Sequence, residues 1–252
     1  MKPATRATLL EVNRRFYRDH AEAFAGKRER PWRGWDALLP RLEDLGRDTD
    51  APRLLDLGCG HGRFAAFLRT APALAAWTLH GVDASAGLLA RARARELGDC
   101  RWDQIDFAGP DALPRGPYAS VVAFGVLHGM PGERERQRLL EACAERLLPG
   151  GLLVFTTWRA LADPRLVSRI RRWSAWDTAR FGPLDVDDLE AGDHLLPWDQ
   201  APDAVRYFHA FEEAELERLS AGLAERGVLL VERYQADGKR GAGNDYFVFR
   251  GS

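Results

Sequence analysis

Short apolar runs alternate with amphipathic segments along the middle of the chain, starting at Arg53. Continuous apolar runs of this length are typical of strands buried on both faces, and apolar positions spaced three and four apart are typical of covering helices. The pattern predicts strands at 53–57, 77–82, 100–105, 119–124 and 151–157, with helices at 62–70, 85–97 and 133–147. Strands and helices in this alternation indicate a doubly wound, mostly parallel α/β sheet.

The segments on either side of this core follow other patterns. Residues 7–24 and 35–45 place apolar side chains on one helical face and predict a helical extension before the core. After the core, an arginine-rich helical stretch and an acidic run predict an inserted cap. The chain closes with a predicted helix at 212–225 and strands at 228–234 and 245–250, whose short turn requires an antiparallel pair. The single predicted domain has an N-terminal extension (1–50), a core (53–158), a cap (159–205) and a C-terminal part of the sheet (206–252).

Composition places the chain among ordinary globular proteins. Its 252 residues include 36 Lys and Arg against 37 Asp and Glu, a formal charge of −1 that excludes a globally basic nucleic-acid binder. Basic stretches at 6–33 and 159–173 leave open either a phosphate-contacting face or a dispersed, solvated surface. The three cysteines lie too far apart for a disulfide framework or a CxxC zinc site, and we expect no metal. No segment has the apolar length of a membrane helix, so we expect a cytoplasmic protein.

The strongest chemical signal is the stretch LLDLGCGHGRF at 54–64, in which a strand, an acid and three glycines open a helix. Glycine allows positive φ and close approach of a ligand to the backbone, and a helix start offers unpaired N–H groups. The spacing DxGxGxG differs from the GxGxxG of dinucleotide sites, and its acid repels a pyrophosphate but attracts the amino group of an amino-acid tail. We therefore predict an S-adenosyl-L-methionine site. Its first contacts are Asp56, Gly58, Gly60 and Gly62.

Two further acids follow the next predicted strands. Asp83 ends the second strand, where a carboxylate can accept both ribose hydroxyls, and a helix N-cap by Asp83 or Ser85 is the structural alternative. Asp106 follows the third strand and is assigned to the adenine amino group, with a turn aspartate as the alternative. Together with VVAFGVLH at 121–128 and LLPGG at 147–151, these motifs resemble the class I S-adenosylmethionine-dependent methyltransferases. The resemblance covers 53–158, assigns Phe124 to the cofactor site and implies a Rossmann-like, seven-stranded sheet whose last strand is antiparallel.

Four flanking segments narrow this resemblance. They are NRRFYRDHAEAFAGKRERPW at 13–32, the region 127–151, GDHLLPW at 192–198 and RYFHAFEEAELERL at 206–219. Together they resemble the methyltransferases that esterify 5-carboxymethyluridine at the wobble position of transfer RNA, including the module of the oxygenase-fused relatives. The resemblance implies transfer RNA as partner and, as in the better-known relatives, a small zinc-binding activator subunit. Relatives usually have two consecutive histidines where this chain has His128 and Gly129.

The same resemblance points to five residues for the methyl acceptor. It assigns Arg28 or Arg206 to the acceptor carboxylate, and His128 and His209 to acceptor orientation. Asp193 is assigned to organising a cation or a base edge. Three of them have a structural alternative. Arg28 belongs to a solvated charge run, His209 is a core histidine, or Asp193 caps a turn beside a glycine.

The predicted chemistry needs little from the protein beyond positioning. A carboxylate with a pKa of roughly 4 is ionised at neutral pH and attacks a sulfonium methyl group without a general base. Two other hypotheses remain open at this point. One is a small-molecule O- or N-methyltransferase whose cap closes over a metabolite, and the other is a non-catalytic RNA-binding or regulatory module on the same scaffold.

Overall fold

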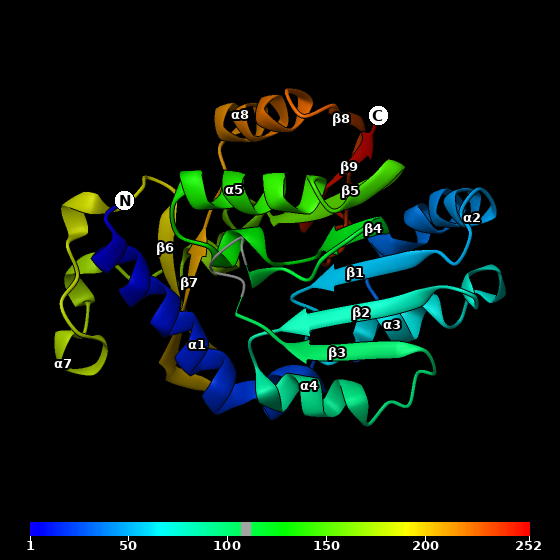
Figure 1. Cartoon of the computed structure of the whole chain (residues 1–252). Helices are drawn as coiled ribbons and strands as arrows, with labels where there is room; N and C mark the ends of the chain where they lie inside the picture. The colour runs from blue at the N-terminus through cyan, green and yellow to red at the C-terminus, as the bar shows by residue number, and fades with distance from the viewer. Residues whose placement is uncertain (107–111) are drawn as a thin grey trace.

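A seven-stranded sheet with the order β3-β2-β1-β4-β5-β9-β8 forms the centre of the computed structural model, which describes residues 1–106 and 112–252 (Figure 1). The strands are β1 (Arg53–Leu57), β2 (Thr78–Asp83), β3 (Cys100–Gln104), β4 (Tyr118–Ala123), β5 (Leu147–Trp158), β8 (Val228–Ala236) and β9 (Asn244–Gly251). Strands β1 to β5 pair in parallel, whereas β9 runs antiparallel between β5 and β8. The predicted Rossmann-like α/β fold, with its antiparallel last strand, is confirmed.

Strand β5 starts at Leu147, before the predicted residue 151. The sequence predicts that Pro149, Gly150 and Gly151 end the preceding helix, but this run lies within the strand. Gly150 has a φ of +73°, which bends the strand where its pairing with β4 shifts register. The preceding helix accordingly ends at Ala144 and not at 147.

Helices cover both faces of the sheet, as the apolar strands require. Strand β4 is buried along its whole length, which leaves no polar alternation. The helices are α2 (Leu39–Arg47), α3 (Arg63–Leu68), α4 (Ala86–Arg93), α5 (Glu133–Ala144) and α8 (Glu213–Ala224). Leucines of α5 and α8 pack in one core cluster, and those of α2 and α3 pack in another with the opposite strand faces. Each such leucine contributes about 1.5–3 kcal/mol by its burial.

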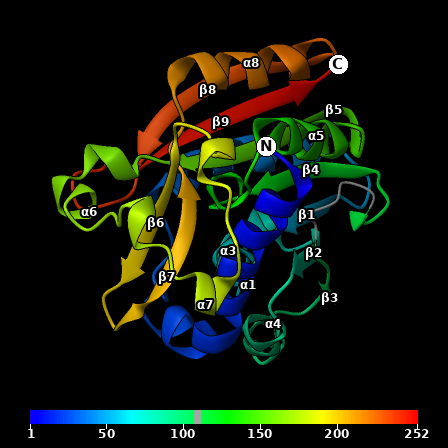
Figure 2. The same cartoon turned by 90° about the vertical axis from the view of Figure 1, so that its left-hand side faces the viewer.

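Helix α1 (Pro3–Gly26) crosses the edge of the sheet at which β1, β2 and β3 end (Figures 1 and 2). It is longer at both ends than the predicted 7–24, and it packs against β7 and α4. A 3-10 helix, η1 (Arg33–Leu38), then leads into α2. Helix α1 therefore lies over the carboxyl edge of the sheet, where open α/β sheets bind ligands, whereas α2 packs on a face of the sheet.

The cap is a series of short turns that ends in a separate two-stranded sheet, formed by β6 (Asp193–Trp198) and β7 (Ala201–His209). The predicted arginine-rich helix is only the single turn α6 (Pro164–Val167), because the chain then extends and Arg171 pairs with Leu195 of β6. A second short helix, α7 (Thr178–Phe181), follows. The predicted cap boundary at 205 falls inside β7, which pairs with β6 up to His209. Among the described helices, none combines the length and hydropathy needed to cross a bilayer.

Candidate functional site

The carboxyl end of β1 leads into a glycine loop. Gly58, Gly60 and Gly62 have φ values of +65°, +55° and +74°, a region that L side chains rarely adopt. A Cβ at Gly60 would meet no atom within 4 Å, so the backbone is open to a ligand there. A Cβ at Gly62 would lie 3.0 Å from the ring of Trp102, so close packing adds to the backbone requirement at the start of α3.

Two acids flank this loop. Asp56 is buried, and its Oδ2 has no hydrogen-bond partner. Burial, and then the negative charge of Asp83, raise the pKa of Asp56 well above its usual range. Asp83 accepts hydrogen bonds from the N–H groups of Gly60, at 2.9 Å, and Ser85, at 2.8 Å. Burial raises the pKa of Asp83, although these two bonds oppose that shift. An orphaned carboxylate oxygen beside a second acid fits a ligand that brings an ammonium group and hydroxyls, as S-adenosylmethionine does.

The other predicted cofactor residues lie close to this edge. Ser85, rather than Asp83, caps α4 by accepting the N–H of Leu88. The ribose contact of Asp83 stays a prediction. Asp106 follows β3 and is exposed, and it pairs with Arg14 of α1 at 2.6 Å. Phe124 follows β4 and packs edge-to-face on Phe64 of α3, with ring centroids 4.7 Å apart.

Three predicted acceptor residues, which are far apart in the sequence, lie near enough at the same end of the sheet to affect one another's charge. Arg28 follows α1, His128 lies in the 3-10 helix η4 (Leu127–Gly129) after β4, and Arg206 lies on β7. The ring of Trp158, at the end of β5, is 5.6 Å from that of His128 and 5.9 Å from the guanidinium of Arg206. We call Arg28, His128, Trp158 and Arg206 the acceptor pocket.

The acceptor pocket carries positive charge that the described residues do not neutralise. Nε of Arg206 and Nδ1 of His128 are buried without a hydrogen-bond partner, and neither Arg28 nor Arg206 has a carboxylate in ion-pair range among the described residues. Burial, and then Arg206, lower the pKa of Arg28 to about 10. Burial and both arginines lower the pKa of His128 to about 3, so its ring is neutral at physiological pH. An anionic ligand would relieve this repulsion.

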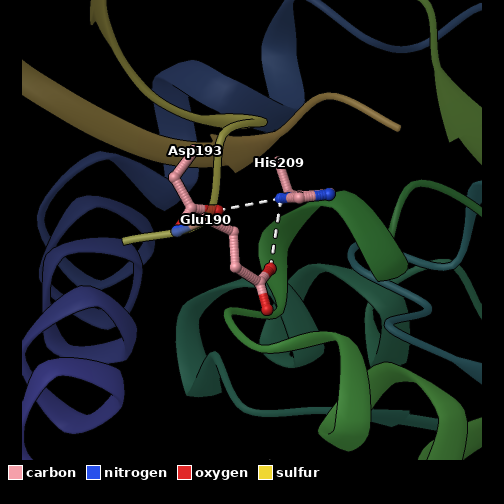
Figure 3. A group of neighbouring side chains, drawn as sticks. All are labelled: Glu190, Asp193 and His209. Atoms are coloured by element: carbon pink, nitrogen blue, oxygen red, sulfur yellow. Dashed lines mark hydrogen bonds and ion pairs between the residues drawn. The ribbon is translucent and has the colours of Figure 1, made fainter. Parts of the chain in front are cut away.

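Asp193 and His209 are buried and lie beside Glu190 (Figure 3). Oδ1 of Asp193 accepts hydrogen bonds from the hydroxyl of Tyr207, at 2.6 Å, and from Nδ1 of His209, at 2.8 Å. The other ring nitrogen of His209 lies 2.7 Å from Oε2 of Glu215 on α8. Two carboxylate neighbours are both satisfied only when His209 carries two protons. Burial lowers the pKa of His209, but the bonds to Asp193 and Glu215 outweigh it and raise the pKa above its usual value.

Arg136 of α5 completes this group. Its guanidinium is fully buried and bonds to Oε1 of Glu215 at 2.8 Å and to Oε2 of Glu190 at 2.7 Å. Oxygen atoms of Glu190 and Asp193 and a ring nitrogen of His209 lie within 4.8 Å of one another, a spacing that also suits a metal ion. Glu190 already pairs with Arg136, and Asp193 with His209, so we assign these atoms to ion pairs within the protein and not to a metal ion. The buried charge network consists of Arg136, Glu190, Asp193, Tyr207, His209 and Glu215.

The structure adds residues that the sequence reasoning missed. Trp158 ends β5 at the ligand-binding edge, and this position after a predicted strand is a signal that could have identified it. Arg63 of the glycine motif lies 5.1 Å from the ring centroids of both Trp32 and Trp35. Arg136 had no such signal, because its segment ERERQR has the pattern of a solvated helix surface.

Comparisons with known proteins find methyltransferases. A methyltransferase domain family matches residues 55–153, which contain the glycine loop and the turn of His128. The chain is similar to trans-aconitate 2-methyltransferase of Streptomyces coelicolor, with 32% identity over 169 residues, or 65% of this chain and 52% of that protein. The enzyme of the same name from Deinococcus radiodurans is 31% identical over 135 residues, or 54% of this chain and 46% of that protein. The chain therefore spans about half the length of the curated relatives it matches.

Solved structures share the whole fold. The DhpI–SAH complex covers 98% of this chain and is itself covered to 98%, with 18% identity and a TM-score of 0.61. A S-adenosylmethionine-dependent methyltransferase from Clostridium acetobutylicum covers 94% of this chain and is covered to 98%, with 10% identity and a TM-score of 0.61. Residues 55–153 thus match a methyltransferase domain, and solved structures named as SAM or SAH complexes share the fold, which agrees with the predicted cofactor. The transfer-RNA partner, the activator subunit and the assigned site residues stay predictions.

Proposed function

We propose that this protein is an O-methyltransferase that esterifies a carboxylate group of a small organic acid. One observation carries the proposal: the acceptor pocket brings two arginines and a neutral histidine together without a carboxylate of the described chain to pair with them. A carboxylate acceptor supplies the missing negative charge. Arg206 can donate from its orphaned Nε, and charge-assisted bonds of this kind are about twice as strong as neutral ones.

The residues of the pocket position the acceptor and do not move a proton. When bound, S-adenosylmethionine supplies an electrophilic methyl group, which a carboxylate already ionised at neutral pH attacks without a base. A histidine with a pKa of about 3 cannot serve as a general acid, so His128 is assigned to hydrogen bonding through its neutral ring. Asp56 and Asp83 would hold the cofactor beside the glycine loop. Positioning of this kind can supply much of the rate acceleration.

The relatives support a small acid over RNA. Both curated relatives are named for the methylation of trans-aconitate, which is a polycarboxylic acid. The transfer-RNA acceptor predicted from the flanking segments offers the same carboxylate chemistry, so the acceptor pocket alone does not separate the two. We favour the small acid because the similarity to these relatives covers 65% and 54% of the chain.

The test is transfer of a labelled methyl group from S-adenosylmethionine by the purified chain. We expect labelled product with trans-aconitate, and mild alkali should release the label as methanol because the product is an ester. A parallel reaction contains transfer RNA that carries 5-carboxymethyluridine. Transfer to RNA alone would support the transfer-RNA acceptor predicted from the sequence instead. The affinity for RNA should then fall steeply with salt. Alkali-stable label, or no transfer to either carboxylate, would overturn the proposal.

A further inference from the structure

The acceptor pocket takes its residues from two segments that belong to different parts of the fold. The η4 turn, which carries His128, follows β4 of the main sheet, and Arg206 lies on β7 of the small sheet. The two sheets form separate hydrogen-bonded units. Something other than strand pairing must therefore fix the span between the η4 turn and β7.

Asn13 of α1 is the first of two bridges between these segments. It is 9% exposed, and its Nδ2 donates to the carbonyl of Gly129 at 3.2 Å and to the carbonyl of Tyr207 at 3.1 Å. Its Oδ1 accepts the N–H of Tyr207 at 2.9 Å. One amide side chain thus satisfies three backbone groups, one next to His128 and two on the residue after Arg206.

Arg136 of α5 is the second bridge, and it approaches from another helix. Its Nη1 donates to the carbonyl of Met130, directly after the η4 turn, at 2.8 Å. Its other contacts reach β7 through Glu215, which is 2.7 Å from Nε2 of His209. Because a strand alternates its faces, Tyr207 and His209 point into the buried charge network. Arg206 and Phe208 point the other way, and both contact Trp158.

We propose that Asn13 and Arg136 are positioning residues, which set the span between the η4 turn and β7 and so the fit of the acceptor carboxylate. Two bridges join the same two segments. Asn13 bonds to backbone atoms of both, whereas Arg136 bonds to the backbone of Met130 and reaches β7 through the side chains of Glu215 and His209. The glycine loop lies outside both bridges, so cofactor binding does not depend on them. The effect on catalysis rests on the proposed function, whereas the effect on the two segments does not.

The kinetic test separates acceptor binding from cofactor binding. In Asn13→Ala we expect KM for trans-aconitate to rise and kcat to fall, each by about tenfold, because a misplaced pocket loses the aligned geometry. The Kd for S-adenosylmethionine, measured by calorimetry, should change by less than about twofold. Glu11→Ala, an exposed position on the same helix, is the matched control and should leave all three constants unchanged. Equal losses in acceptor and cofactor binding would show a merely structural role and overturn the proposal.

A second variant and a measurement that needs no activity test the two bridges separately from the proposed function. Arg136→Lys keeps the charge but loses the forked donors, and Arg138→Lys is its exposed control on the same helix. Hydrogen exchange with S-adenosylhomocysteine bound should become faster in residues 127–131 and 203–209 of Asn13→Ala and Arg136→Lys, and stay unchanged in residues 57–64. No change in the first two segments, or faster exchange in all three, would overturn the positioning role. If the wild-type protein esterifies no acid, the proposed function fails and the exchange result still decides this inference.

Discussion

Replacement of Arg206 by methionine is the sharpest test of the acceptor pocket, because activity should fall while the stability of the fold is kept. The guanidinium makes cation–π contacts at 5.1 Å to Phe16 and 5.9 Å to Trp158, together worth about 1–2 kcal/mol. Two effects oppose these contacts. The buried Nε of Arg206 has no acceptor, which costs about 1–3 kcal/mol, and the positive charge of Arg28 repels that of Arg206. We expect the free energy of unfolding of Arg206→Met to stay within about 1 kcal/mol of the wild-type value, or to rise.

Activity should fall sharply in the same variant. One charge-assisted hydrogen bond to the acceptor is worth about 1.5–3 kcal/mol, so kcat/KM should fall by about 10- to 100-fold. The assays are urea unfolding and methyl transfer to trans-aconitate at several acceptor concentrations. Arg172→Met, an exposed position of the cap, is the control and should change neither quantity. A loss of more than about 2 kcal/mol in unfolding free energy with little kinetic change would refute the reasoning, because Arg206 would then be a structural residue.

Three further predictions concern the cofactor edge and the buried charge network. Asp83→Asn should raise the Kd for S-adenosylmethionine about tenfold in calorimetry, and an unchanged Kd would contradict the assigned ribose contact. Gly62→Ala should lower the thermal midpoint, because strain at φ +74° costs about 1–2 kcal/mol, while Gly26→Ala, with nothing within 4 Å, should not. Burial lowers the pKa of His209, but the bonds to Asp193 and Glu215 raise it above its ordinary value in the folded protein. Its stabilisation is therefore complete below the ordinary value and is lost as pH rises through the raised one. Urea unfolding from about pH 6 to 9 should show this decline in the wild type, and a decline of equal size in His209→Gln would rule it out.

The sheet could be predicted from the sequence because its signal is local. Strands such as β1 and β4 are buried on both faces, so apolar residues fill them continuously, and each strand is visible without its neighbours. The glycine loop is equally local, since positive φ at three positions requires glycine whatever surrounds them. The cap lacks such periodicity. Its turns are held by distant groups, for example Leu195, which pairs with Arg171, and the predicted helix is therefore wrong beyond one turn.

The candidate site could be predicted only in part, for a related reason. Arg28, His128 and Arg206 were found through family resemblance, and the structure brings them together beside Trp158. Arg136 could not be found, because its burial depends on Glu215, which is 79 positions away. A charged residue within a charged helical stretch has the pattern of a solvated surface until its distant partners are known.

Among the described residues, the side chain of Asn13 bonds only to backbone atoms of Gly129 and Tyr207 beside the acceptor pocket. It contacts the carbonyl of Gly129, and a Cβ at that position would lie 3.5 Å from Nδ2 of Asn13, an ordinary contact. A methyl group at position 129 would thus leave the bond between Asn13 and the η4 turn intact. Side chains beside the acceptor pocket can therefore change while the hydrogen bonds that hold its backbone stay in place.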